Sequence, residues 1–255
     1  MATQSAVFGS NPLLKRPNVS VSFTQWQLDE WDRCAGDAEY FAEHYIKIVN
    51  VDRGLINFEM YAYQRKMIKT FQDNRFVITK MPRQSGKSTT VTSYMLWKIL
   101  FQDNQNCCIL ANKGRLANDL LDKIKTAYEN LPLWIQQGVV VWNRGSIELE
   151  NGSKVMAAAT SSSSVRGGSY NLILLDEFAF VQSNLAENFF ASVYPTISSG
   201  EKTQVIIVST PFGMNHYHKM WVDATEGRSS YVPLEVHWTE TPGRGEEFKR
   251  QTIRN

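Results

Sequence analysis

The stretch Arg75–Thr90 most constrains how this chain can fold. It begins with a β-branched apolar run, continues into a short polar loop that ends Gly86-Lys87-Ser88, and then becomes helical. A strand, a loop and a helix in this order are the layout of a phosphate-binding loop, because the helix N-terminus presents free N–H groups to an anion. The usual pattern GxxxxGK[ST] has glycine at the position of Met81. The loop by itself is therefore also compatible with a chance match.

Apolar runs alternate with helical patterns along the chain, which is typical of an α/β protein with a mostly parallel sheet covered by helices on both faces. Such sheets bind ligands beyond the carboxyl ends of their strands. The sequence predicts strands at 76–81, 107–111, 172–175 and 205–208, three short strands between 139 and 160, and helices at 61–71, 87–101, 116–131, 183–192 and 217–224.

Composition places the chain among ordinary globular proteins. Its 255 residues are 43% hydrophobic and 20% charged, and the net charge is only +2. Because dedicated nucleic-acid-binding domains are usually more basic, we expect any contact with DNA to be local. No run approaches the ~20 apolar residues of a membrane span, and the N-terminus lacks the features of a signal peptide. The sequence predicts an intracellular protein with no membrane partner.

Three cysteines occur, at Cys34, Cys107 and Cys108. Neighbouring residues of a strand point to opposite faces, so Cys107 and Cys108 are poorly placed to bind one metal ion. We expect reduced thiols in the core, which suits a reducing compartment.

Changes in composition divide the chain into four parts. Residues 1–24 are polar and without periodicity, and are expected to form a flexible lead-in. Residues 25–60 begin with two helical patterns and are expected to pack on the core as a small helical N-terminal subdomain. Residues 61–238 form the predicted nucleotide-binding core, and residues 239–255 form a polar extension.

A second cluster of functional side chains follows the apolar strand at 172–175. Asp176 is expected to hold Mg²⁺, directly or through water, and Glu177 to act as general base on an attacking water molecule. An acidic pair can also simply end a strand and cap the next helix. However, the phosphate loop, this pair and Ser209-Thr210 each follow a predicted parallel strand, so they meet at one sheet edge. Together they favour an ATP-hydrolysing site.

Transfer of a phosphoryl group also needs a cation that neutralises developing charge. Arg83 lies inside the loop and can reach the phosphates of its own subunit, whereas Arg166, in the Ser- and Gly-rich stretch 161–168, is placed to act on a neighbouring subunit. The sequence leaves open which arginine acts. Upstream, Tyr63 can stack on adenine and the Gln64 amide can both donate to and accept from its edge, although a glutamine on a helix surface explains the residue as well.

Together these motifs resemble the large terminase subunit of tailed bacteriophages, most closely that of phages with contractile tails. The resemblance covers about residues 55–215 and rests on Tyr63-Gln64-Arg65, PRQSGKS from Pro82 to Ser88, SVRG around Arg166, LILLDE ending at Glu177, and Ser209-Thr210-Pro211. In that family the loop has arginine where Arg83 stands and lacks the first glycine. Met81 is therefore a family feature.

The resemblance implies a P-loop NTPase fold of the additional-strand, catalytic-glutamate type, and an ATP-driven motor that packages double-stranded DNA into a procapsid. It assigns nucleotide contacts to Tyr63, Gln64, Pro82, Arg83, Gln84, Ser85, Gly86, Lys87, Ser88 and Thr89, Mg²⁺ to Ser88 and Asp176, catalysis to Lys87, Arg83, Arg166 and Glu177, and coupling to movement to Ser209, Thr210 and Pro211. It implies the portal protein and the small terminase subunit as partners, a ring of five subunits, and the host cytoplasm. The family's C-terminal nuclease domain is expected to be missing, with residues 239–255 leading toward it.

Two other functions fit the same motifs. A helicase-type nucleic-acid translocase also carries Asp-Glu after a strand, although such enzymes usually need a second recombinase-like lobe. A nucleotide-gated assembly module would show little turnover as an isolated domain, because an arginine from a neighbouring subunit would be missing.

Overall fold

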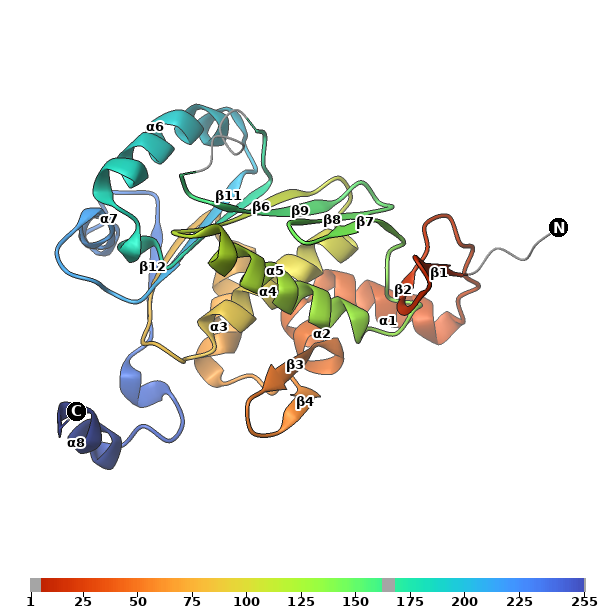
Figure 1. Ribbon diagram of the computed structural model, residues 1–255, viewed down its shortest axis with the longest axis horizontal. Helices are drawn as coiled ribbons and strands as arrows, with labels where there is room; N and C mark the ends of the chain where they lie inside the picture. Colours follow the sequence, from red (N-terminus) through yellow and green to blue (C-terminus); the bar gives the residue numbers. More distant parts are fainter. Residues whose placement is uncertain (1–5, 162–167, 255) are drawn as a thin grey trace.

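The helices and strands follow the predicted alternation, as the computed structural model of residues 6–161 and 168–254 shows (Figure 1). The helices are α1 (Gln25–Gly36), α2 (Ala38–Tyr45), α3 (Ala62–Asp73), α4 (Lys87–Phe101), α5 (Gly114–Glu129), α6 (Ser183–Ser199), α7 (His216–Thr225) and α8 (Glu246–Arg254), with the short 3-10 helices η2 (Phe178–Phe180) and η3 (Trp238–Glu240). The strands are β1 (Val7–Phe8), β2 (Asn11–Lys15), β3 (Lys47–Asn50), β4 (Gly54–Asn57), β5 (Phe76–Lys80), β6 (Asn106–Ala111), β7 (Val139–Asn143), β8 (Ser146–Leu149), β9 (Lys154–Ala159), β10 (Leu172–Asp176), β11 (Gln204–Ser209) and β12 (Val232–Glu235).

One sheet of eight strands, in the order β12-β5-β11-β10-β6-β9-β8-β7, organises the fold. From β12 to β9 the neighbouring strands are parallel, whereas β8 and β7 continue the sheet as antiparallel strands. β11 lies between the strand that leads into the phosphate loop, β5, and the strand that ends in the acidic pair, β10. This inserted strand is the additional strand of the predicted fold class, which is confirmed.

Apolar cores lie on both faces of the sheet. Helices α1 to α5 cover one face, and α6 and α7 cover the other (Figure 1). Because successive side chains of a strand point to opposite faces, Cys107 joins the first core and Cys108 the second. Both are free thiols, and burial raises the pKa of each. The opposite facing expected for these two neighbouring residues is thus observed. Among the described helices, none is long and apolar enough to cross a membrane.

Local sequence signals set several element boundaries. The Thr24 hydroxyl accepts a hydrogen bond from the Gln27 N–H at 3.3 Å, and the Gln27 side chain accepts from the Thr24 N–H at 2.9 Å, which is a capping box at the start of α1. Helix α4 begins and ends at the predicted residues. Helix α6, expected to end at Ser192, continues to Ser199.

Within the segment 1–24, for which the sequence predicted loose order, β1 and β2 form a short antiparallel hairpin. Gln136, whose side chain is 1% exposed, holds it to the core. The Gln136 Oε1 accepts from the Lys15 N–H at 2.9 Å, and its Nε2 donates to the Leu13 carbonyl at 2.9 Å. These contacts join residues that are 121 and 123 positions apart in the sequence. Local sequence patterns therefore give no sign of them.

Replacement of Gln136 by alanine should detach this hairpin. The amide also donates to the carbonyls of Tyr128 and Leu131. The Tyr128 carbonyl keeps the Leu131 N–H as a donor, so the main loss in Gln136→Ala is the partner of the Leu131 carbonyl and of the Lys15 N–H. A buried group left without a partner costs about 1–3 kcal/mol. We expect a loss of roughly 2–3 kcal/mol in the free energy of unfolding in urea, together with faster hydrogen exchange over residues 11–18. Gln25→Ala, at an exposed position of α1, is the matched control; equal exchange in both variants would contradict the role of Gln136.

Candidate nucleotide-binding site

The loops that follow β5, β11 and β10 meet at one edge of the sheet. In the sheet register Lys80 lies beside Ser209, and Asp176 lies beside Val208. Met81 is still attached to the sheet, because its N–H donates to the Ser209 carbonyl at 3.1 Å and its side chain is 1% exposed. The backbone leaves the sheet only after this residue, which explains why position 81 accommodates a large apolar side chain where the common pattern has glycine.

The backbone of the loop has the shape of an anion-binding nest. Gln84 and Gly86 are left-handed, with φ of 55° and 73°. Such alternation gathers backbone N–H groups on one side, next to the N-terminus of α4, where they favour an anion. The φ of Gly86 by itself favours glycine at this position. A Cβ there would also lie 2.4 Å from the Gln64 Nε2, so the end of the Gln64 side chain would have to shift.

Tyr63 and Gln64, which precede the loop on α3, support it from behind. The Tyr63 hydroxyl donates to the Ser85 carbonyl at 2.8 Å, and the Ser85 hydroxyl donates to the Pro82 carbonyl at 2.9 Å. Gln64 is 2% exposed, and its Oε1 accepts from the Tyr61 N–H at 2.9 Å. Both predicted adenine-contacting side chains therefore have a role in shaping the loop, and their contact with adenine stays a prediction.

Lys87 joins the three motifs. Its Nζ lies 2.7 Å from the Glu177 Oε1 and donates to the Thr210 Oγ1 at 3.3 Å. The Thr210 N–H in turn donates to the Glu177 Oε2 at 3.4 Å. The Lys87 side chain is 8% exposed and that of Glu177 25%, so the pair is little screened by solvent. The structure thus brings together residues 87, 177 and 210, as the sequence predicted.

Glu177 has an uncommon backbone conformation. Its φ of 48° and ψ of 41° are left-handed, which costs a non-glycine residue of order ~1–3 kcal/mol and persists only where the surroundings hold it. The Ser209 hydroxyl accepts from the Ala179 N–H at 3.0 Å and so fixes the turn that follows Glu177. This turn directs the Glu177 carboxylate to Lys87. Ser209, predicted as a coupling residue, therefore links β11 directly to the acidic motif.

Asp176 is a buried carboxyl with one oxygen available. It is 6% exposed, and its Oδ1 has no hydrogen-bond partner among the described residues. Burial, followed by the neighbouring Glu177 carboxylate, raises the pKa of Asp176 from 3.8 to about 7, and Lys87 acts in the opposite direction. A divalent cation at this oxygen would relieve both effects, so the residue fits a magnesium ligand. Within residues 6–161 and 168–254, no group of three or more His, Cys, Asp or Glu could hold a metal ion, so magnesium would also need oxygens from a bound phosphate.

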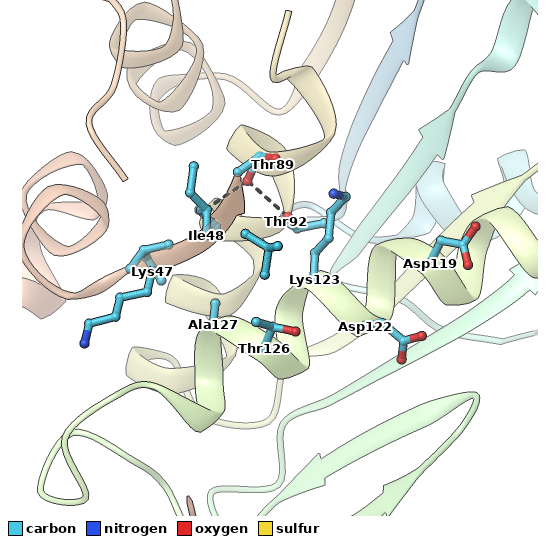
Figure 2. A pocket seen from close by; sticks show the side chains of 12 residues that line it. Lys47, Ile48, Thr89, Thr92, Asp119, Asp122, Lys123, Thr126 and Ala127 are labelled. Atoms are coloured by element: carbon cyan, nitrogen blue, oxygen red, sulfur yellow. Dashed lines mark hydrogen bonds between the residues drawn. The ribbon is translucent and has the colours of Figure 1, made fainter. Parts of the chain in front are cut away.

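Thr89 lies on a cleft beside the loop rather than in the loop. The cleft, of about 180 Å³, is lined by residues of α4, α5 and β3. The Thr92 hydroxyl donates to the Thr89 carbonyl at 3.0 Å on its wall (Figure 2). Lys123, on the same cleft, lowers the pKa of Asp176, which burial raises. Local sequence gives no signal of this proximity between Lys123 and Asp176.

Of the two candidate arginines, only Arg83 lies within the described residues. The Arg83 guanidinium carbon lies 5.7 Å from the centre of the ring of Phe180, a residue of η2, which follows the acidic motif. The Phe180 ring stacks on the Phe212 ring, with 4.7 Å between the ring centres. Arg83 is thus held at the edge of the site. Arg166 lies outside the described residues.

The fold and this sheet edge define a P-loop NTPase of the additional-strand class. Residues 78–255 match the family model described as "Terminase large subunit, T4likevirus-type, N-terminal". This match covers more than half of the chain, so the chain belongs to that family, and the resemblance seen in the sequence is confirmed.

Solved structures of phage large terminases share the fold. The large terminase of bacteriophage HK97 has a TM-score of 0.72 at 16% identity, with 86% of this chain and 51% of that protein covered. A variant of the ATPase domain of Thermus phage P74-26 large terminase has a TM-score of 0.64 at 15% identity, covering 78% of this chain and 90% of that domain. The large terminase of a thermophilic bacteriophage in complex with ADP has a TM-score of 0.57 at 15% identity, covering 76% of this chain and 50% of that protein. The chain therefore spans about half the length of the HK97 protein and of the ADP-bound one.

The raised pKa of Asp176 predicts a pH-dependent stability. In the folded state the Asp176 carboxyl keeps its proton up to about pH 7, whereas in the unfolded chain it loses the proton near its ordinary pKa of 3.8. Between pH 3.8 and about 7 the folded state therefore binds more protons than the unfolded state. Stability therefore falls as the pH rises through this window. Asp176→Asn removes the titration, so in EDTA its Tm should exceed that of the wild type at pH 8 by more than at pH 5. Asp103→Asn, at an exposed position, is the control, and an Asp176→Asn difference independent of pH would contradict the assignment.

Proposed function

We propose that this chain is the ATP-hydrolysing motor domain of a phage large terminase, which drives double-stranded DNA into a procapsid through the portal protein. The observation that carries the proposal is the contact of Lys87 with both Glu177 and Thr210. It joins the phosphate loop, the acidic motif and the predicted coupling motif in one cluster. The structures of the thermophilic phage's large terminase with ADP and with ATP-γ-S support nucleotide binding by this fold.

In the proposed reaction, the loop N–H groups and Lys87 bind the phosphates of ATP, and Glu177 activates water. Phosphate and Glu177 compete for the Lys87 ammonium, so phosphate binding frees the Glu177 carboxylate to accept a proton. The water oxygen forms a bond to the γ-phosphorus while the bond to the β,γ-bridging oxygen breaks, giving ADP and phosphate. Arg83 or Arg166 stabilises the charge that develops on the transferred group.

Ser88 and Asp176 would hold the magnesium ion of the bound nucleotide. Magnesium supplies charge neutralisation on the β- and γ-phosphate oxygens when bound. The buried Asp176 carboxyl supplies the negative charge for this ion, since its Oδ1 has no partner within the described chain. Ser88, at the second position of α4, contributes a hydroxyl at the helix N-terminus.

The segment Ser209-Thr210-Pro211 is proposed to couple hydrolysis to movement. Thr210 contacts both Lys87 and Glu177, so it senses how these charges redistribute when the γ-phosphate leaves. Ser209 passes the change to the turn at Ala179. We further propose the small terminase subunit and a ring of five copies as partners, by family resemblance, with the packaging reaction in the host cytoplasm.

Replacement of Glu177 by glutamine should separate binding from hydrolysis. Loss of a general base lowers kcat by about 10²–10⁴-fold, whereas ATP binding should persist because Lys87 and the loop remain. Lys87→Ala should abolish both. Steady-state ATP hydrolysis and binding of a fluorescent ATP analogue measure the two effects, with Glu201→Gln and Lys202→Ala, at the opposite end of β11, as matched controls. Turnover like that of the wild type in Glu177→Gln would exclude it as the base.

A mixing experiment should decide between the two arginines. If Arg166 acts on a neighbouring subunit, Arg166→Ala and Glu177→Gln proteins, each inactive, regain part of the ATPase rate when mixed, since one interface then combines both intact groups. The specific rate of the wild type should also rise with protein concentration. If Arg83 acts within its own subunit, Arg83→Ala mixed with Glu177→Gln shows no such recovery. Duplex unwinding by the chain alone would instead favour the helicase-type translocase.

A further inference from the structure

The outward-facing carbonyl groups of the phosphate loop are held by side chains from two distant parts of the chain. The Arg244 Nη2 donates to the Arg83 carbonyl at 2.6 Å and to the Gln84 carbonyl at 3.3 Å. The next carbonyl, that of Ser85, accepts from the Tyr63 hydroxyl. Three consecutive carbonyls of the loop are therefore bound from outside, two of them by a guanidinium that follows β12.

These bonds favour the conformation that an anion requires. In a nest, the N–H groups point to the concave side and the intervening carbonyls point away from it. The left-handed Gln84 creates this geometry at a conformational cost, because it is not a glycine. A charged donor on the Gln84 and Arg83 carbonyls offsets that cost and polarises the peptide groups whose N–H would face phosphate.

Arg244 is itself positioned by the segment that carries it. The Arg244 guanidinium carbon lies 5.1 Å from the centre of the Phe248 ring. The backbone N–H of Arg244 donates to the Thr241 carbonyl at 3.2 Å. Phe248 stacks on Trp238 with a centroid distance of 6.3 Å. A cavity of about 300 Å³ remains between this segment and the loop, lined by Pro82, Trp238, Arg244, Phe248, Lys249 and Thr252. Pro82 is the residue by which the loop lines this cavity.

We propose that Arg244 is a positioning residue of the phosphate loop, and that it couples nucleotide binding to docking of the segment 238–252. The inference rests on the proposed binding of ATP. If docked Arg244 favours the binding-competent loop, bound nucleotide must favour the docked segment by the same factor, because coupling between two binding equilibria is reciprocal. The nucleotide state of the loop is thereby transmitted to the chain that follows the sheet.

Replacement of Arg244 by glutamine should raise the KM for ATP with little change in kcat. Arg244 binds the carbonyl side of the loop, so its effect is equal in the ground state and the transition state. A hydrogen bond from a charged donor is stronger than one between neutral groups, and because this arginine is partly exposed we expect roughly a 5- to 10-fold rise in KM. Arg244→Lys should restore part of the affinity, and Arg250→Gln, an exposed arginine on α8, is the matched control.

Hydrogen exchange of the segment tests the coupling in the opposite direction. A non-hydrolysable ATP analogue with Mg²⁺ should slow amide exchange in peptides spanning 241–252 in the wild type and in Arg250→Gln, but not in Arg244→Gln. A merely structural role for Arg244 would raise exchange in the variant without making it insensitive to nucleotide.

The outcomes separate this inference from the proposed function. If the wild type binds and hydrolyses ATP while Arg244→Gln keeps its KM and nucleotide leaves exchange over 241–252 unchanged, the coupling is refuted and the ATPase function stands. If the wild type binds no ATP analogue in the fluorescence assay, the proposed function fails and the coupling fails with it. Thermal unfolding of Arg244→Gln checks that the variant is folded, and the wild-type exchange experiment needs no substitution.

Discussion

The register of three parallel strands is the constraint on which the site depends. β5, β11 and β10 are adjacent and in parallel, with Thr79 beside Val208 and Val208 beside Asp176. The loops that leave these strands therefore start at the same level of the sheet. A shift of one residue in any strand would turn its side chains to the other face and would separate Lys87 from Glu177. Burial of the strands on both faces, in two apolar cores, makes such a shift unfavourable.

This edge of the sheet concentrates charge that the chain itself only partly compensates. Asp176 is buried with an oxygen that lacks a partner in the described chain, Lys87 is nearly buried and paired with Glu177, and Glu177 is held in a left-handed conformation. Each of these features is unfavourable for a site with a purely structural role. Together they are consistent with a site shaped for a bound phosphate and cation. The phosphate and the cation would pair with charged side chains that now pair with one another or lack a partner.

Support for the phosphate loop comes from outside the loop. Gln64 and Tyr63 pack behind it from α3, Ser209 binds Met81 from β11, and Arg244 binds its carbonyls from the C-terminal segment. A loop that has no glycine at position 81 and a non-glycine left-handed residue at position 84 depends on these contacts more than a glycine-rich loop would. The loop is therefore connected to three separate elements: α3, β11 and the segment that carries Arg244.

The sequence by itself determined the elements whose signals are local. The β-branched run before Met81, the start of α4 at Lys87, the capping box at Thr24 and the alternate facing of Cys107 and Cys108 all follow from properties of neighbouring residues. The parallel order of motifs was enough to place Lys87, Glu177 and Thr210 at one edge, because strands of a parallel sheet end on the same side. The hairpin at 7–15, the packing of Gln64 under Gly86, the proximity of Lys123 to Asp176 and the bonds of Arg244 were decided only by the tertiary structure. These contacts join residues far apart in the chain, and polar side chains such as Gln136 and Arg244 look in the sequence like any exposed residue until the fold supplies their partners.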